Sequence, residues 1–401
     1  MSNLGHELPL ILLLIALLGL RVRVTPRARI FIAAPPEKVF ALVDFSEGET
    51  QRWQRTRVRS MLVDPASRTY KLSFTTPLAT GAVQSGEALF RVSRRDVPFR
   101  LEAERVGLEG QSSNSQLLSI RAELVPQQGG TMLTLMHRWG PRPLLAQLLA
   151  RADLWGSVHR IKGVAETGVP NFRADALISA AVASLTGVAS LYAFAYAFGW
   201  TFAGLLVVAL LVHEFGHLLA YRLIGQPWGR LVFLPFLGAV AVPRVGFTSQ
   251  AQIVFSALMG PGFSVLLSAG CMLWVWMGLP HGETAAMLGI VSCALNLFNL
   301  LPVEPLDGGV ALRSVLGRLM GSGARFGLMA AGALIILAGL AIDQVLLVIF
   351  GALAFVFNIR KRSIDRGLEP LSRLGIVISA FSFSSVLAAH ATLLRHFLGN
   401  G

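Results

Sequence analysis

The chain has 401 residues, of which 54% are hydrophobic and only 14% are charged, and its mean hydropathy is +0.61. It is too apolar for a soluble enzyme, so we expect an integral membrane protein with some soluble mass, in contact with a lipid bilayer. The formal net charge of +13 does not indicate nucleic-acid binding, because the Arg clusters flank apolar runs, as they do at the cytoplasmic borders of membrane spans. The composition therefore predicts no nucleic-acid partner.

An apolar run, residues 8–20, lies close to the N-terminus. No Lys or Arg precedes it and no small-residue cleavage pattern follows it, which argues against a removed signal peptide. The run is short against the roughly 20 residues that a spanning helix needs. We expect residues 1–22 to be an uncleaved membrane anchor, with an interfacial helix as the alternative. The Arg-rich stretch 21–29 then places the following residues in the cytoplasm.

Residues 26–170 differ in pattern from the rest of the chain. Charges are frequent there, and apolar residues alternate with polar ones in 70–74, 117–125 and 131–138, which is the period of half-buried strands. A Pro- and Gly-containing turn between the last two runs indicates a hairpin. A long helix is expected from residue 143 to about residue 166. The pattern predicts one cytoplasmic α+β domain, large enough for its own core.

Apolar runs of spanning length follow one another from residue 174 onward. Two spans should be joined by a tight outside turn at Gly199-Trp200, and the second should return to the cytoplasm at Arg222. The expected spans are 174–198, 201–221, 253–279, 284–301, 326–341, 345–357 and 374–394. We therefore predict a multi-pass α-helical membrane protein with an N-terminal α+β soluble domain, a membrane core at 174–320 and additional transmembrane helices at 321–401.

The second span contains His213-Glu214-Phe215-Gly216-His217, inside an apolar run, 205–219, with no other ionisable residue. Two imidazoles one helical turn apart face the same way and can share one divalent metal ion, while the glutamate between them can act as a base. Polar groups in hydrocarbon are costly and persist mainly where they function. The pentapeptide predicts one Zn²⁺ per chain, bound inside the membrane.

A tetrahedral catalytic zinc takes three protein ligands and leaves the fourth position for water, so a third ligand must come from elsewhere. The best candidate is Asp307, which follows the inner end of the 284–301 span. Two prolines between them break helix geometry, and Gly308-Gly309 permits a close approach beside the ligand. Glu304 remains open as a rival ligand or a supporting acid, against the simpler interpretation of a solvated charge at the membrane border.

The two motifs together resemble a known family. A membrane-embedded HExxH, followed about ninety residues later by N-x-x-P-x-x-P-L-D-G at 299–308, resembles the site-2 protease family of zinc intramembrane metalloproteases. The resemblance implies that His213, His217 and Asp307 are the metal ligands. It also implies that Glu214 activates the water.

Further segments extend the resemblance over residues 174 to about 320. Asn299 matches the family asparagine that holds the substrate backbone or the developing oxyanion. Residues 234–240, with Gly238, resemble the membrane-inserted β-hairpin of the family, so Asn299 and Gly238 are implied as substrate-binding residues. Gly260-Pro261-Gly262 resembles its small-residue helix motif.

The opening of the soluble domain, residues 30–40, resembles the start of the START/polyketide-cyclase-like (SRPBCC, helix-grip) superfamily, in which a strand leads into a-P-x-e-x-V-f and a short helix. Many strands and one long C-terminal helix follow in that superfamily, as expected here. The resemblance implies a cavity for an apolar ligand, whereas a domain used only for protein contacts or regulation is the alternative. His137 and His159 lack partners at ligand spacing and are interpreted as surface or core histidines.

These observations predict an intramembrane zinc metalloprotease that hydrolyses a peptide bond in or near a transmembrane segment of substrate membrane proteins. Glu214 would take a proton from a water whose pKa the zinc lowers toward ~7. A helical substrate has its backbone groups satisfied, so it would unwind locally and add as a strand to residues 233–242. The predicted location is a bacterial inner membrane, with the soluble domain and the opening of the active site on the cytoplasmic side.

Two alternatives remain. One is a non-proteolytic membrane protein with a degenerate metal site, whose soluble domain binds a lipid or apolar ligand. The other is a zinc protease of the prenyl-protein-processing kind, which takes a glutamate ligand from a downstream helix motif that does not occur in this sequence. The remaining histidines are expected at outer ends or polar borders, away from the metal; they are His6, His281, His390 and His396.

Overall fold

The computed structural model describes residues 21–399, with gaps at 78–82, 107–116, 236–237 and 305 and over most of 342–367. Nearly all of the expected anchor, residues 1–22, and most of the expected span 345–357 therefore lie outside the described residues, as does His6. The chain divides into two compact units, Met1–Leu185 and Thr186–Gly401.

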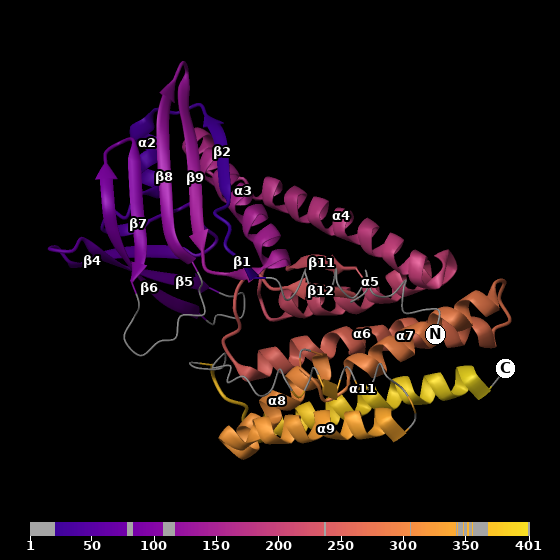
Figure 1. The fold of residues 1–401 in the computed structure, drawn as a ribbon. Coiled ribbons are helices and arrows are strands. Elements are labelled where there is room, and N and C mark those ends of the chain that lie inside the picture. The colour runs from indigo at the N-terminus through magenta and orange to yellow at the C-terminus, as the bar shows by residue number, and fades with distance from the viewer. Residues whose placement is uncertain are drawn as a thin grey trace. The chain divides into compact units, whose positions relative to one another are not determined.

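The first unit contains an eight-stranded antiparallel sheet in the order β2-β9-β8-β7-β6-β5-β4-β3 (Figure 1). Successive strands are neighbours, except that β2 pairs with β9 and so brings the first strand beside the last. A two-residue pair, β1 (Arg21–Val22) with β10 (Arg142–Pro143), lies outside this sheet. The strands are β2 (Arg27–Ile32), β3 (Gly48–Thr50), β4 (Arg57–Asp64), β5 (Thr69–Pro77), β6 (Val83–Asp96), β7 (Arg100–Val106), β8 (Leu117–Gln127) and β9 (Gly130–Trp139).

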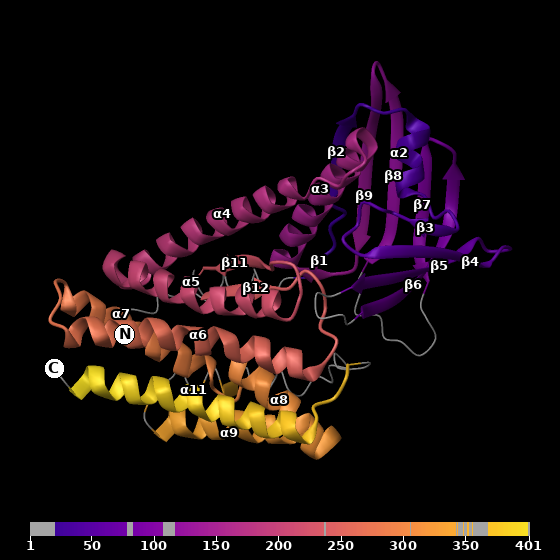
Figure 2. The ribbon, with the colours of Figure 1, turned by 180° about the vertical axis from the view of Figure 1, so that it is seen from behind.

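Two helices, α2 (Pro36–Val43) and α3 (Leu144–Thr167), contact each other and pack on the sheet (Figure 2). Proline suits the first position of α2 because its missing N–H would have no partner in a first turn. On α3, Leu154, Val158 and Ile161 recur at helical spacing and are at most 1% exposed, in one apolar core with residues of the sheet. A curled antiparallel sheet with one long C-terminal helix confirms the predicted α+β helix-grip class.

A buried ion cluster ends this unit. Asp175 lies in the first turn of α4 (Phe172–Phe198), and its fully buried carboxylate accepts from Arg160 at 2.6 Å and from Arg55 at 3.0 Å. A Cβ at Gly156 on α3 would collide with this carboxylate, so only glycine allows the two helices to approach here. The guanidinium of Arg55 also lies over the ring of Phe172, 4.4 Å from its centroid. These contacts join the start of α4 to the helix-grip domain.

The second unit is mostly helical. After α4 ends at Phe198, Gly199 makes the turn with φ 83° and α5 begins at Trp200, as the sequence predicted. In the part of the chain that the structure describes, four helices are long and apolar enough to cross a membrane, namely α4, α5, α6 and α11, and α9 holds a shorter apolar stretch. This confirms the multi-pass class; α7, the expected span 284–301, is a helix but is not one of the four. The elements are α5 (Trp200–Leu223), β11 (Arg230–Leu234), β12 (Gly238–Val242), α6 (Gln250–Trp276), α7 (Gly282–Asn299), α8 (Asp307–Met320), η1 (Gly321–Gly323), α9 (Ala324–Ala341) and α11 (Arg373–Gly399).

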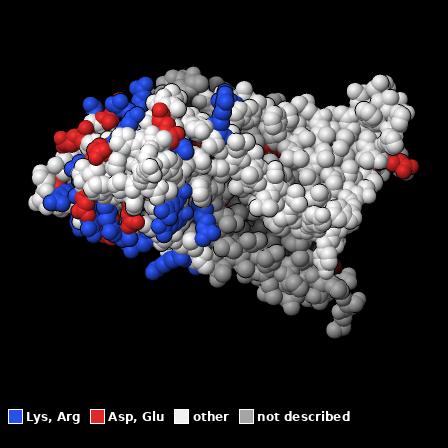
Figure 3. Space-filling view, turned by 90° about the horizontal axis from the view of Figure 1, so that it is seen from above, with Lys and Arg blue, Asp and Glu red and all other residues white. Residues whose placement is uncertain are grey.

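Small residues bring the helices of the second unit close together. A Cβ at Gly216 on α5 would collide with the backbone of α6 at Met259 and Gly260, so glycine at this position permits the crossing. On the facing sides of α6 and α7, the fully buried hydroxyls of Ser268 and Ser292 are 2.9 Å apart. Figure 3 shows one face of the surface: on this face charged side chains crowd one end of the molecule, whereas the rest of the described surface is almost uncharged.

Candidate zinc site

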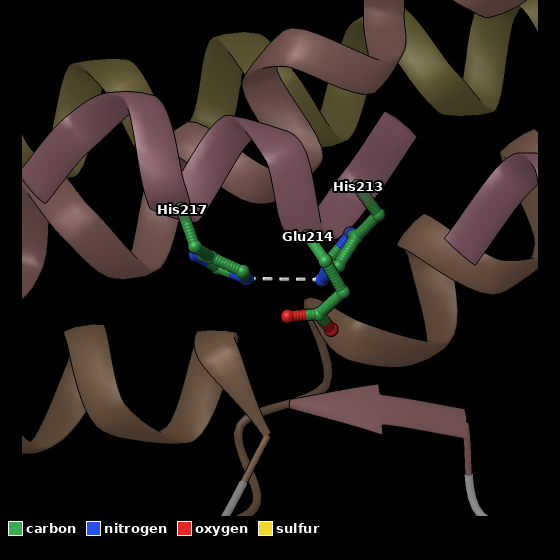
Figure 4. Close-up of side chains that lie close together, drawn as sticks. All are labelled: His213, Glu214 and His217. Atoms are coloured by element: carbon green, nitrogen blue, oxygen red, sulfur yellow. Dashed lines mark hydrogen bonds between the residues drawn. The ribbon is translucent and has the colours of Figure 1, made fainter. Parts of the chain in front are cut away.

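The two histidines of the pentapeptide meet inside the second unit. His213 and His217 lie one turn apart on α5, are 2% and 8% exposed, and have ring centroids 4.8 Å apart. Their Nε2 atoms point toward one another and are separated by 3.1 Å (Figure 4). The helical spacing therefore places both imidazole nitrogens at one point, as the sequence predicted.

Hydrogen bonds from neighbouring helices orient both imidazoles. Nδ1 of His213 faces Oδ1 of Asn296 at 2.7 Å, and the Asn296 amide is itself oriented because its Nδ2 donates to the Ser292 carbonyl. Nδ1 of His217 faces the backbone carbonyl of Ser256 at 2.7 Å. Since both partners are acceptors, each Nδ1 carries a proton, which leaves Nε2 as the nitrogen of each ring that can bind a metal ion. This is the arrangement that metal-binding histidines need.

Asp307 approaches the same point from the first turn of α8. Its Oδ2 lies 3.1 Å from Nε2 of His213 and 3.4 Å from Nε2 of His217. Gly308 and Gly309 allow this position, because a Cβ on either would collide with backbone of residues 300–304. The glycine pair thus permits the close approach that the sequence predicted.

The three atoms fit a tetrahedral zinc ion. Metal–ligand distances of about 2.0–2.1 Å imply ligand–ligand edges of roughly 3.3 Å, and the three observed separations are 3.1, 3.1 and 3.4 Å. Two lone pairs and a carboxylate oxygen converge here, and within the described residues Oδ2 of Asp307 is buried without a hydrogen-bond donor. Three acceptors this close repel one another unless a cation lies between them. The donor set, two imidazoles and one carboxylate, is one that zinc accepts.

The Glu214 carboxylate lies beside the two imidazoles (Figure 4). Its side chain forms a group with His213 and His217 whose potential ligand atoms all lie within 4.8 Å of one another. The carboxylate accepts a hydrogen bond from the backbone N–H of Ala241 in β12. Its other oxygen, Oε2, is buried and has no hydrogen-bond partner within the described part of the chain. One oxygen of Glu214 is therefore held and the other is available for a proton.

The remaining predicted residues lie as follows. Asn299, at the end of α7, donates through Nδ2 to the Leu295 carbonyl at 3.2 Å. Gly238 begins β12 with φ 111°, which favours glycine at the hairpin turn. Glu304 forms an ion pair with Arg313 at 2.9 Å. The roles of Asn299 and Glu304 at the histidine pair stay predictions.

Asn296 is the site residue that the sequence interpretation missed. It is fully buried and orients His213. The sequence analysis had instead assigned a role in the site, substrate binding, to Asn299, three residues later. A signal was available, since Gly289, Ser292, Cys293 and Asn296 recur at helical spacing and are all buried. That face of small and polar residues identifies the side of α7 that turns inward.

The other histidines are placed by packing. His390 does not lie at a polar border: it is fully buried on α11, with Nε2 2.9 Å from the Pro261 carbonyl of α6. In the helix-grip domain, burial lowers the pKa of His137 to about 4, so this side chain is neutral at physiological pH. His159 stacks obliquely near Trp155 on α3. Among the histidines of the described residues, only His213 and His217 belong to a cluster of potential metal ligands.

Comparisons of sequence agree with this geometry. No family model matches the chain. It is 34% identical to the candidate zinc metalloprotease Rip3 of Mycobacterium tuberculosis over 137 residues, 33% of this chain and 35% of the relative. It is 30% identical to a candidate zinc metalloprotease of Synechocystis over 121 residues, 29% of this chain and 32% of the relative. The matches thus span about a third of each relative's length, and they confirm the predicted resemblance to zinc metalloproteases.

Two solved structures bear likenesses to parts of the chain. The site-2 protease from Methanocaldococcus jannaschii is 18% identical, with a TM-score of 0.32, over 45% of this chain and 89% of that one. The Aha1 dimer protein from Colwellia psychrerythraea is 14% identical, with a TM-score of 0.27, over 36% of this chain and 98% of that one.

Proposed function

We propose that this integral membrane protein is an intramembrane zinc metalloprotease that hydrolyses a peptide bond in or near a transmembrane segment of other membrane proteins. The observation that carries the proposal is the convergence of Nε2 of His213, Nε2 of His217 and Oδ2 of Asp307, with an unpartnered oxygen of Glu214 beside them. In this proposal the first three residues hold one Zn²⁺ per chain, and Glu214 is the catalytic base.

When bound, zinc supplies a Lewis acid that polarises a carbonyl and lowers the pKa of a water molecule. Oε2 of Glu214 accepts the proton of the attacking water and returns it to the nitrogen of the leaving amine as the C–N bond breaks. Asn296 and the Ser256 carbonyl hold the Nδ1 side of each histidine, so that Nε2 is the nitrogen that would bind the zinc. The nearly closed surroundings of His213 and Glu214, which are 2% and 3% exposed, exclude bulk water.

The hairpin β11–β12 supports a peptide as substrate. Ala241 directs its N–H toward Glu214, so its backbone groups face away from β11. Because this direction recurs at every second residue, Ala239 presents its N–H and C=O on the same edge. We propose that an unwound substrate segment pairs there as an added strand, with Gly238 and Asn299 on the substrate side. Substrates with Gly, Pro or small residues near the cut unwind most easily.

We also propose the location and the division of labour that the sequence predicted. The domains are 1–22, 26–170, 174–320 and 321–401, with residues 26–170 and the opening of the site on the cytoplasmic side of a bacterial inner membrane. The helix-grip domain would select substrates or control access. A ligand cavity in that domain stays a prediction, because Leu72, Leu101 and Leu133 of the sheet join the residues of α3 in one contiguous core.

The test is cleavage of a single-span reporter by the purified full chain in proteoliposomes. Glu214→Gln should abolish cleavage while the zinc content, measured by atomic emission, stays at one ion per chain, because the amide cannot take the proton but no ligand is lost. The matched control is Glu283→Gln, the same change at an exposed residue in the first turn of α7, which should cleave like the wild type. Cleavage that persists in Glu214→Gln would refute the assignment of the base.

A further inference from the structure

Both backbone groups of one hairpin residue are held by the helix that carries the metal motif. The hydroxyl of Tyr221 donates to the Ala241 carbonyl at 3.0 Å, and the Ala241 N–H donates to Glu214. The N–H and C=O of one strand residue point to the same edge, so both side chains grip the same edge of β12. Glu214 and Tyr221 are seven residues apart, two helical turns, and so share one face of α5.

Tyr221 is fitted closely into the base of the hairpin. It is 5% exposed, and its ring centroid lies 6.1 Å from that of Phe247, just beyond β12. Just before β11, a Cβ at Gly229 would lie 2.8 Å from Cδ2 of Tyr221, so glycine there leaves room for the ring. The ring therefore packs at the open end of the hairpin, beside the residues just before β11 and just after β12. From there the hydroxyl reaches the Ala241 carbonyl.

The opposite edge of the hairpin is held as well. Ala241 pairs with Leu231 and Ala239 pairs with Phe233, so the backbone groups of Phe233 face outward from β11. The Phe233 N–H donates to Oγ1 of Thr186 on α4 at 3.2 Å. The backbone groups of Ala241 and Phe233 therefore both point away from the partner strand. One of these contacts lies on each edge of the hairpin. The Tyr221 hydroxyl is the contact on the edge that faces Glu214.

We propose that Tyr221 is a positioning residue for Glu214. Its hydroxyl holds the Ala241 carbonyl, so that the Ala241 N–H stays directed at one carboxylate oxygen and the other, Oε2, stays turned toward the histidine pair. A glutamate has three rotatable side-chain bonds, so one fixed donor removes most of its freedom before the reaction. The inference rests on the proposed function, because positioning matters only if Glu214 is the base.

Tyr221→Phe tests the hydroxyl alone, because the ring and its packing remain. In the reporter assay, kcat should fall about tenfold while KM stays within twofold and the zinc content and melting temperature stay unchanged. The control is Tyr192→Phe, the same change at a tyrosine that is 61% exposed on α4, which should match the wild type. A kcat within twofold of the wild type, or a loss of zinc or stability that accounts for the fall, would overturn the proposal.

A double variant separates positioning from mere support of the fold. In Glu214→Asp the shorter carboxylate cannot reach both Ala241 and the histidine pair, so adding Tyr221→Phe should lower the residual rate less than twofold. A full further tenfold loss would indicate a structural role and contradict the proposal.

Hydrogen exchange gives a readout that needs no activity. In zinc-loaded full chain, Tyr221→Phe should speed exchange of the amides in 238–242 at least tenfold and leave those of α7 unchanged; unchanged exchange would overturn the proposal. If Tyr221→Phe speeds the exchange as expected but the wild type cleaves no reporter, the proposed function fails, whereas the role of Tyr221 in holding Ala241 is supported. If the wild type cleaves and the variant is normal in both assays, the positioning inference fails alone.

Discussion

The two units place their polar side chains in opposite ways. The helix-grip domain buries an apolar core and covers its sheet with exposed ion pairs, such as Arg94 with Asp96. The second unit exposes large apolar side chains, with Trp276 at 81% and Phe381 at 73%, and buries polar ones, among them Ser264 and Asn296. The difference follows from the solvent: lipid tails are as apolar as leucine, so membrane helices gain from small residues and interhelical hydrogen bonds inside.

Each unit also contains an aspartate enclosed among basic or metal-binding partners, and we expect the two, Asp175 and Asp307, to have different purposes. Asp175 faces two guanidinium groups, which satisfy its charge within the protein. Asp307 faces two imidazole nitrogens, which can balance its charge only by taking up a proton or by sharing a metal ion. The Asp175 carboxylate is therefore expected to stabilise the fold. The Asp307 carboxylate is expected to bind a cation. The same substitution, Asp to Asn, can test this contrast.

The largest expected effect is that of Asp307→Asn. Zinc affinity should fall at least about 100-fold, because one of three ligands is lost, and cleavage should become undetectable. Metal-free protein should lose less stability than Asp175→Asn costs, because the Asp307 carboxylate has no permanently charged partner among the histidines. Zinc titration and thermal unfolding in chelator measure both. A loss of metal-free stability as large as that of Asp175→Asn would contradict the contrast between the two aspartates.

This site shows how far a sequence can carry such a prediction. The spacing of His213 and His217 specifies their geometry almost completely, because the helix itself sets it. Asp307 could be predicted from the position of its motif at the end of a span. Asn296 was missed because its role depends on the rotation of α7 about its axis: Asn296 is fully buried beside His213, whereas Asn299, three residues later, is only partly buried and donates to the Leu295 carbonyl. Local periodicity predicts which residues are helical better than it predicts which of two neighbouring amides turns inward.

The fold likewise has features that local sequence patterns predict and features that they do not. The strands and the long helix of the first unit were predictable because their periods are local, as in 117–125 and 131–138. The pairing of β2 with β9 was not, because sheet order depends on contacts between residues about a hundred positions apart. His390 was expected at a polar border and is fully buried, because α11 packs against α6 at Pro261, where its imidazole meets a carbonyl. No sequence pattern within α11 predicts that His390 contacts the Pro261 carbonyl.

The next effect in size is that of Asp175→Asn, the counterpart of Asp307→Asn. Two buried or half-buried guanidinium groups, of Arg160 and Arg55, would lose their counter-charge, which should cost about 3 kcal/mol of unfolding free energy in the helix-grip domain. Hydrogen exchange of the sheet amides in the full chain measures this loss. Zinc content should not change.

The matched control is Asp96→Asn. Its ion pair with Arg94 is about half exposed on both sides, with side chains 49% and 53% exposed, so solvent screening should limit the cost to less than about 0.5 kcal/mol. If Asp175→Asn cost no more than this control, the buried cluster would not be what stabilises the start of α4.

The smallest effect sharpens the contrast inside the second unit, where close helix packing and the metal site coincide. A Cβ at Gly260 on α6 would collide with the His217 ring, with Nε2 its nearest atom, so Gly260→Ala should displace this ligand and lower zinc affinity about tenfold. Gly270→Ala lies on the same helix with nothing within 4 Å of its Cβ and should bind zinc like the wild type. Competition with a chromogenic chelator measures both affinities. If the two variants bound zinc equally well, α6 would be able to shift without displacing His217. The small residues of α6 would then matter for the packing of the membrane helices and not for the zinc site.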